Sequence, residues 1–422
     1  MAQNRTEFTL SQWLDWVEKM HPTEIELGLD RVRQVYLNLA LDFGDTQLVT
    51  VAGTNGKGST ITYLSEILQC AGLRTGCYTS PHFLRYNERV VLGREQASDE
   101  ALCAAFRAVD AVRGEISLTY FEWGTLVALY LLSEAQLDVA LLEVGLGGRL
   151  DAINIVDPHI AVVTSIGLDH IDWLGDDLNV IAAEKAGIFR AGRPAVCGAE
   201  NPPPAIKSTA GELGALLYQK GEQFTAERDA ECWHWQGVDA QGETVCYREL
   251  PIPQLPFQNA ATALQVLVLL PLEIGSDAIA QGLDQARMTG RMQEVKLPEG
   301  RCLLDVAHNP QAAELMVERL SEYRGKVRLL LGMLGDKDYN EVLRILQPLA
   351  SGFYLATLAS PRGCSSESLA SQLSDNGNVH CYDSVAEALN AARASLLPDE
   401  ILLVAGSFFT VSAALEALNT GA

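Results

Sequence analysis

The residues with the clearest chemical potential form a glycine-rich loop, G-T-N-G-K-G-S-T, at residues 53–60. The apolar, β-branched run at residues 48–52 predicts a buried strand before it, and the apolar spacing over residues 61–71 predicts a helix that Gly72 ends. A glycine loop in this context presents backbone N–H groups to phosphate, and Lys57 adds a positive charge. We therefore predict a phosphate site. The alternative is a tight strand–helix connection that happens to contain a lysine.

The loop is a shorter variant of the usual phosphate-binding pattern. That pattern, G-x-x-x-x-G-K-[ST], would place a glycine at Val51 and a hydroxyl at Gly58. Here the hydroxyls follow at Ser59 and Thr60, in position for phosphate oxygens or a Mg²⁺ ion.

Three further polar residues follow predicted strands: Ser80, Glu143 and His170. Ligands of an open parallel sheet bind outside the carboxyl ends of the strands, so we expect these side chains near the glycine loop. A hydroxyl, a carboxylate and an imidazole could hold one Mg²⁺, although imidazole is an unusual ligand for this ion. Each residue also has a structural interpretation: a turn residue before proline, a strand-end charge and a helix-capping histidine.

Composition restricts the class of protein and its partners. The chain has 422 residues, a length that favours two or three domains. Of these residues 48% are hydrophobic, which is typical of a globular protein. A formal net charge of -23 argues against nucleic acid or an anionic membrane as partner, and no apolar run is long enough to span a membrane. Nine cysteines without a C-x-x-C pair, and the lack of a signal sequence, predict a reduced, cytoplasmic protein.

Two α/β units are expected to position these residues. The near-continuous apolar run at residues 138–144 predicts a central parallel strand that is covered on both faces. Other strands are predicted at residues 74–79, 160–166, 194–197, 302–306, 327–333, 352–357, 379–382 and 401–404. Helices are predicted at residues 8–20, 25–41, 98–112, 119–134, 180–190, 259–270 and 310–320. A polar loop is expected at residues 80–89, an antiparallel excursion at 218–253 and a hinge at 286–292.

Six motifs resemble folylpolyglutamate synthases, and more narrowly the bacterial bifunctional dihydrofolate synthase/folylpolyglutamate synthases, a branch of the Mur ligase superfamily. They are G-T-N-G-K-G-S (53–59), T-S-P-H (79–82), E-V-G-L-G-G-R-L-D-A (143–152), S-I-G-L-D-H (165–170), E-K-A-G-I (184–188) and D-V-A-H-N-P (305–310). The motifs occur in order over nearly the whole chain, and the first and third are specific.

The resemblance implies an α/β protein in which a P-loop parallel-sheet ATPase domain is followed by a smaller Rossmann-like α/β domain. Residues 1–290 would bind ATP and a pterin or folate, and residues 291–422 would bind glutamate. The implied reaction is ATP-dependent amide ligation through an acyl phosphate. Its substrates would be dihydropteroate, reduced folates and L-glutamate.

The resemblance also assigns the nucleotide and metal sites. The residues implied to bind ATP are Thr54, Asn55, Gly56, Lys57, Gly58, Ser59, Asn259, Arg291 and Asp305. Ser80, Glu143 and His170 would hold one Mg²⁺. Lys185 would be carbamylated by CO₂ and hold a second Mg²⁺, whereas the residues alone suggest a surface neighbour of Glu184.

The implied substrate residues fall into two groups. A dihydropteroate pocket would contain Thr119, Tyr120, Phe121, Glu122, Leu150, Asp151 and Ala152, and a glutamate site would contain His308 and Ser407. The implied catalytic residues are Lys57, Lys185 and His308. Phe121 could instead be a core residue. Asp151 is expected to pair with pterin N–H donors, but it could instead brace the glycine loop before it.

Two other functions compete with this interpretation. A Mur ligase of cell-wall synthesis would use the same chemistry, but it has a further domain before the loop, for which about fifty residues are too few. A nucleotide-dependent switch would not need a second domain with the polar helix start at His308. We expect a monomer that binds neither nucleic acid nor membrane.

Overall fold

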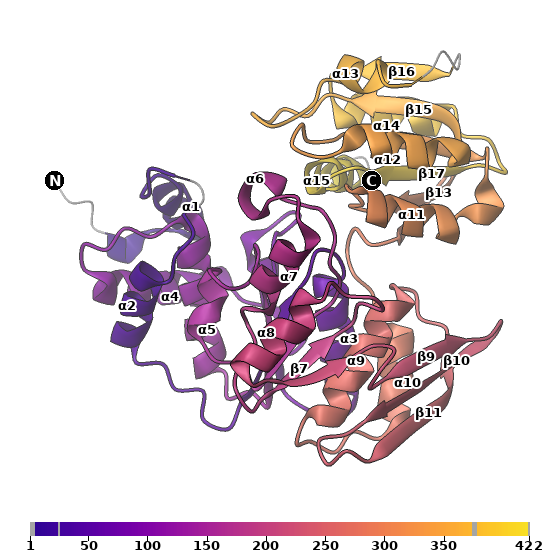
Figure 1. Ribbon diagram of the computed structural model, residues 1–422. Coiled ribbons are helices and arrows are strands. Elements are labelled where there is room, and N and C mark those ends of the chain that lie inside the picture. The colour runs from indigo at the N-terminus through magenta and orange to yellow at the C-terminus, as the bar shows by residue number, and fades with distance from the viewer. Residues whose placement is uncertain (1–4, 24–25, 374–377, 421–422) are drawn as a thin grey trace. The chain divides into compact units, whose positions relative to one another are not determined.

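The computed structural model describes residues 5–23, 26–373 and 378–420. The chain divides into two compact units, Met1–Ala286 and Arg287–Ala422, each with its own sheet (Figure 1). The division falls within the predicted hinge at residues 286–292.

The first unit is built on an eight-stranded sheet with the order β4-β3-β2-β5-β1-β6-β7-β8. β5 (Val139–Glu143) is buried along its whole length and pairs in parallel with β1 (Gln47–Ala52) and β2 (Thr75–Tyr78), which confirms the predicted central strand. β6, β7 and β8 extend the parallel sheet, whereas β3 and β4 are antiparallel. These strands are β3 (Val90–Leu92), β4 (Glu95–Gln96), β6 (Ile160–Val163), β7 (Pro194–Cys197) and β8 (Leu216–Gln219).

Helices cover both faces of this sheet. On one face α3 (Lys57–Cys70) contacts α9 (Phe257–Leu269) and α10 (Ser276–Gln285). On the other face lies a large hydrophobic core. Its helices are α1 (Leu10–Glu18), α2 (Asp30–Leu39), α4 (Asp99–Arg113), α5 (Tyr120–Glu134), α7 (Leu178–Ala186) and α8 (Ala205–Leu213).

A small antiparallel sheet completes the first unit, as residues 218–253 predicted. It contains β9 (Thr225–Arg228), β10 (Cys232–Val238) and β11 (Thr244–Pro251). The strands pack beside α9 and α10, as Figure 1 shows, and Trp235 Nε1 of β10 donates to Ala261 O of α9 at 3.1 Å.

The second unit has a six-stranded sheet with the order β12-β13-β17-β14-β15-β16. β12 (Gln293–Leu297) is antiparallel to its neighbour, and the other strands are parallel. These are β13 (Gly300–Leu304), β14 (Val327–Leu331), β15 (Ala350–Ala356), β16 (Val379–Tyr382) and β17 (Ile401–Ala405). Its helices are α11 (Pro310–Arg319), α12 (Tyr339–Leu346), α13 (Ser366–Ala370), α14 (Val385–Ala394) and α15 (Phe408–Thr420). The expected α/β fold class is therefore confirmed for both units.

Several predicted boundaries were wrong for local reasons. α3 begins at Lys57 because Gly56, with φ +89°, turns the chain directly into the helix, so part of the predicted loop is its first turn. The helix predicted from residue 25 begins only at Asp30, after Gly28 at φ +153°. The predicted polar loop contains a 3-10 turn, η2 (Tyr86–Arg89), which leads into β3. The prediction missed β3, β4, β8 and β12, which are short or lie at sheet edges with weak apolar patterns.

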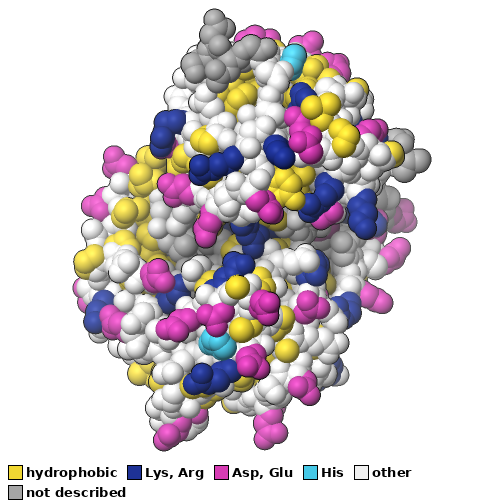
Figure 2. Space-filling model, turned by 90° about the vertical axis from the view of Figure 1, so that its right-hand side faces the viewer, with side chains coloured by type: hydrophobic (Ala, Val, Ile, Leu, Met, Phe, Trp, Pro, Cys, Tyr) yellow, Lys and Arg dark blue, Asp and Glu magenta, His cyan; other side chains and the backbone are white. Residues whose placement is uncertain are grey.

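The surface carries charges of both signs. On the face shown in Figure 2, Lys and Arg side chains are interspersed with Asp and Glu. Among the described residues, none of the helices has the length and apolar character needed to cross a membrane.

Candidate active site

The glycine loop lies between β1 and α3 and passes very close to its neighbours. Gly53 and Gly56 have φ values of +148° and +89°, which side-chain-bearing residues rarely adopt. A Cβ atom on Gly53 would lie 2.0 Å from Thr164 Oγ1, and one on Gly56 would lie 2.5 Å from Asn259 Oδ1. Both glycines are therefore required by conformation and by packing.

The carboxyl end of β6 holds this loop in place. The Thr54 N–H donates to Ser165 O at 2.8 Å, and the Asn55 N–H donates to Ser165 Oγ at 2.9 Å. Thr164 Oγ1 donates to Asn55 O at 2.7 Å. Thr164 and Ser165 were not predicted as site residues, although their position at a strand end was a usable signal.

Lys57 and Asn259 both act on the loop. Lys57 Nζ donates to Gly53 O at 3.0 Å and lies 3.4 Å from Thr54 O, and it forms no ion pair with a carboxylate of the described residues. Asn259 of α9 donates from Nδ2 to Ser59 Oγ at 2.7 Å. The loop thus has a cationic group available for phosphate and is contacted from a helix 200 residues away in sequence.

Ser80 and Glu143 lie together at the ends of β2 and β5. The Ser80 N–H donates to Glu143 Oε2 at 3.0 Å, and Glu143 is buried. His170 occupies the N-cap position of α6 (Ile171–Leu174) with φ +52°, and its side chain is 42% exposed. A hydroxyl beside a buried carboxylate offers the oxygen ligands that Mg²⁺ prefers, so the residues present fit this ion.

Lys185 is buried in α7, which rules out the surface interpretation. The loop at residues 145–149 packs on α7 so closely that a Cβ on Gly148 would lie 2.7 Å from Glu184 O. Burial, and then the charge of Lys57, lowers the pKa of Lys185 to about 7, while Asp169 opposes the shift. A substantial fraction of Lys185 is therefore a neutral amine near pH 7.

Two residues of the expected pterin pocket form the start of α5. Thr119 and Glu122 make a capping box, in which the Thr119 N–H donates to Glu122 Oε2 at 2.7 Å and the Glu122 N–H donates to Thr119 Oγ1 at 3.2 Å. Arg31 Nη2 also donates to Glu122 Oε1 at 3.0 Å. Phe121, which lies between Thr119 and Glu122 in the sequence, is half-buried and packs against Gly145, where a Cβ would be 2.5 Å from Phe121 Cζ. Tyr120 is also half-buried.

Asp151 is occupied with the backbone around it. Its Oδ2 accepts the Leu146 N–H at 2.8 Å and its Oδ1 accepts the Ile153 N–H at 3.0 Å. Burial raises the pKa of this carboxyl to about 6. These contacts agree with the alternative in which Asp151 braces the glycine-rich loop at residues 145–149. Its neighbour Leu150 is half-buried, and its neighbour Ala152 is buried.

The second unit places its predicted residues at the carboxyl ends of β13 and β17. Asp305 Oδ2 accepts the Met292 N–H and Oδ1 accepts the Ala307 N–H, both at 2.9 Å. Burial raises the pKa of Asp305, and the positive charge of Arg291 opposes this. His308 Nδ1 lies 2.8 Å from Val306 O, and Ser407 Oγ accepts the Thr410 N–H at 3.1 Å. The predicted residues therefore form two groups, one at the carboxyl ends of the strands of each sheet. We call these the first edge, in the first unit, and the second edge, in the second unit.

These features define a class of protein, the ATP-dependent ligases of the Mur type. Residues 51–223 match the family described as Mur ligase middle domain, and residues 290–408 match Mur ligase, glutamate ligase domain. The chain is 44% identical over 412 residues to the dihydrofolate synthase/folylpolyglutamate synthase of Escherichia coli, covering 97% of this chain and 96% of that protein.

Solved structures agree with this similarity. One is Escherichia coli FolC in complex with DHPP and ADP, with a TM-score of 0.93, 44% identity and 99% coverage of both chains. Another is a bifunctional folylpolyglutamate synthase/dihydrofolate synthase with Mn, AMPPNP and L-glutamate bound, with a TM-score of 0.91, 45% identity, and coverage of 98% of this chain and 99% of that one. The chain belongs to the dihydrofolate synthase/folylpolyglutamate synthase family, and the alternative of a cell-wall Mur ligase is not supported.

Proposed function

We propose that this chain uses ATP to join L-glutamate to dihydropteroate, forming dihydrofolate, and to folylpolyglutamates. The proposal is supported above all by the groups that meet at the carboxyl ends of the strands of the first sheet. These are the Lys57 loop, the Ser80–Glu143 pair and the buried Lys185, which lie on adjacent elements. The full-length similarity to bifunctional folate enzymes supports both acceptors.

The glycine loop would bind and orient the phosphates of ATP. Backbone N–H groups at the start of α3, where Gly58 and Ser59 lie, would face the phosphates, with Thr54, Asn55 and Gly56 in the loop before it. Lys57 would exchange its contact with Gly53 O for a γ-phosphate oxygen and so oppose charge that develops during transfer. Asn259, Arg291 and Asp305 would complete the nucleotide site.

Ser80, Glu143 and His170 would hold a divalent metal. When bound, the metal neutralises phosphate charge and orients the γ-phosphoryl group. The acceptor carboxylate attacks the γ-phosphorus and ADP leaves, which gives an acyl phosphate. The glutamate amine then attacks the acyl carbon, loses a proton and expels phosphate, so that the amide forms.

Lys185 would react with CO₂ in its neutral form. The amine nitrogen bonds to the carbon of CO₂ and loses a proton, which leaves a carbamate anion. The neutral amine is thereby converted into an anion whose oxygen atoms suit a second Mg²⁺. The lowered pKa of Lys185 supports this role, since protonated lysine does not react.

The remaining assignments follow the two units. Residues 1–290 would bind ATP and the pterin or folate, with Thr119, Tyr120, Phe121, Glu122, Leu150, Asp151 and Ala152 around the pterin. Residues 291–422 would bind glutamate through His308 and Ser407. We also propose a monomer that works in the cytoplasm, where its nine unpaired cysteines would stay reduced.

A product assay tests the proposed function. Purified protein is incubated with ATP, Mg²⁺, L-glutamate and either dihydropteroate or a reduced folate monoglutamate. We expect phosphate release to require both the acceptor and glutamate, with products heavier by one glutamyl residue. Phosphate release that is independent of either substrate would contradict ligation.

A further inference from the structure

One buried cation beside the proposed acceptor pocket has no carboxylate partner among the described residues. Arg89, at the end of η2, is only 8% exposed. Its Nε donates to His82 Nδ1 at 2.9 Å, and its guanidinium lies 5.4 Å and 5.6 Å from the ring centres of Tyr86 and Tyr120. This imidazole accepts a hydrogen bond from the guanidinium but has no negative charge with which to compensate it.

Another buried arginine of this chain, Arg113, and the largely buried Arg328 do have carboxylate partners. Arg113 is 9% exposed and also lies beside two aromatic rings, but its Nε donates to Asp110 Oδ1 at 2.8 Å. Arg328 donates to Glu400 Oε2 at 2.7 Å. A buried charge without a counter-ion is unfavourable, so Arg89 has the environment of a ligand-binding group rather than of a structural ion pair.

The position of Arg89 relates it to both ends of the acceptor. The Arg89 carbonyl accepts the Thr79 N–H at 2.9 Å. Ser80, which follows Thr79 in the chain, donates its backbone N–H to Glu143 of the proposed metal site. Its guanidinium faces Tyr120 of the proposed pterin pocket. An acceptor that extends from the pocket to the phosphoryl group would therefore pass close to Arg89.

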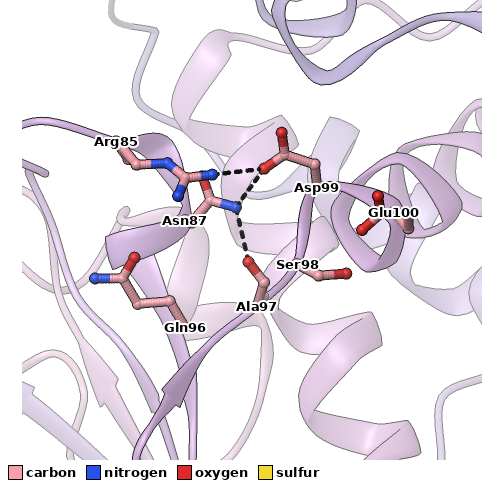
Figure 3. Close-up of a pocket in the computed structure, with 7 residues that line it drawn as sticks. All are labelled: Arg85, Asn87, Gln96, Ala97, Ser98, Asp99 and Glu100. Carbon is pink, nitrogen blue, oxygen red and sulfur yellow. Dashed lines mark hydrogen bonds and ion pairs between the residues drawn. The ribbon is translucent and has the colours of Figure 1, made fainter.

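A neighbouring cavity is a poorer site for an anion. This cavity, shown in Figure 3, has a volume of about 380 Å³ and is formed by η2 with its preceding residue Arg85, the end of β4 and the start of α4. Its arginine, Arg85, is already paired with Asp99 at 3.1 Å, and Asn87 donates to the same carboxylate at 2.7 Å. Glu100 adds a second negative charge, so this cavity disfavours carboxylates.

We propose that Arg89 binds the non-reacting carboxylate of a folate acceptor and thereby sets the preference between the two acceptors. Dihydropteroate has one carboxylate, on its benzoate ring, and this group must react. A folate that ends in glutamate has two carboxylates at that end, of which one reacts and the other stays an anion. A guanidinium fork matches a carboxylate in charge and shape. The inference rests on the proposed function.

The test combines one variant with one altered substrate. Wild-type protein and Arg89→Gln are assayed with dihydropteroate, with a reduced folate monoglutamate, and with its analogue in which the non-reacting carboxylate is a primary amide. In the wild type, we expect the amide to raise KM by about ten- to a hundredfold, as expected for a lost charged hydrogen bond. In Arg89→Gln, acid and amide should be used equally, and the kcat/KM ratio of folate to dihydropteroate should fall by a similar factor.

Arg113→Gln is the matched control, because it removes a buried arginine of the same unit that already has a carboxylate partner. It should keep the wild-type ratio of the two acceptors. If wild-type protein uses acid and amide equally, the role of Arg89 is wrong, and this result does not require the variant to fold. If neither unmodified acceptor supports phosphate release, the proposed function itself fails.

Discussion

The two units carry the same kind of loop at the edge of a parallel sheet, but their charges differ. In each unit a buried strand ends in a polar loop that leads into a helix, and a buried aspartate accepts two backbone N–H groups. These are Asp151 in the first unit and Asp305 in the second. The first edge also has Lys57 and Lys185, neither of which is ion-paired with a described carboxylate.

At the second edge, the charge of Arg291 acts directly on Asp305. Asp305 accepts an N–H group of the loop, and the N-cap Asn309 accepts one from the first turn of α11, the Ala312 N–H, through Oδ1 at 3.0 Å. The first edge therefore keeps positive charge available for an anionic ligand, whereas polar groups of the second edge bind its own backbone. Substitutions should therefore affect chemistry more at the first edge and stability more at the second.

The largest expected effect is that of Lys57→Ala. Ligation with either acceptor should fall at least about 10²- to 10³-fold, because a group that opposes developing charge is lost. The stability of the protein should change little, since Lys57 contacts only carbonyls of its own loop. Phosphate release and thermal denaturation measure the two effects.

Lys207→Ala, at an exposed lysine paired with Glu222, is the control. A folded Lys57→Ala protein with near wild-type turnover would show that the cation of the first edge is not needed for catalysis.

Lys185 should make activity depend on pH and on CO₂. With its pKa at about 7, the neutral fraction rises from about one-tenth at pH 6 to about nine-tenths at pH 8. Activity should therefore rise over this range, and removal of dissolved CO₂ should lower it reversibly. Lys185→Gln should be insensitive to CO₂.

The same shift has a consequence for stability. The pKa of Lys185 is lower in the folded state than its ordinary value of 10.5, so the unfolded chain binds the extra proton between these values. The contribution of Lys185 to folding thus improves as pH rises from about 7 to 10.5 and worsens as pH falls through this window. Comparing Lys185→Gln with wild type in denaturation at several pH values measures it.

Asp151→Ala should reduce both ligations together, by about tenfold, because it frees the Leu146 and Ile153 N–H groups and loosens the loop. Both reactions are measured on one preparation. A selective loss with dihydropteroate would instead show that Asp151 contacts the pterin directly. Asp151 would then bind substrate, whereas Asp305 of the second edge supports its own loop.

Asp305→Ala should have the smallest effect on kcat, with loss of its part in the proposed nucleotide site appearing as a higher KM for ATP, and it should have a clear effect on stability. Two buried N–H groups lose their acceptor, which should destabilise the second unit by about 1–3 kcal/mol. Chemical denaturation followed by a signal from that unit measures this loss. Unchanged stability together with a large fall in kcat would show that the second edge is as catalytic as the first.

From the sequence alone we could place the central strand at β5, the loop of Lys57 and the order of most other elements, but not β3, β4, β8 and β12. Apolar runs and glycines report local conformation, and these features are local. The sequence also identified the family, because its six motifs are specific and occur in order. The sequence could not predict the first residues of α2 and α3, because the backbone turns at Gly28 and Gly56 set where these helices begin.

Tertiary structure decided how the site is supported. Thr164 and Ser165 bind the glycine loop only because β6 lies beside β1. Lys185 looked like a surface residue next to Glu184, but residues 145–149 pack closely on α7, and burial together with the charge of Lys57 lowers the pKa of Lys185. Likewise, the charge of Arg89 is ordinary in the sequence, and it became informative when folding buried it without a carboxylate among the described residues. Burial and partners depend on distant segments, so no local pattern contains them.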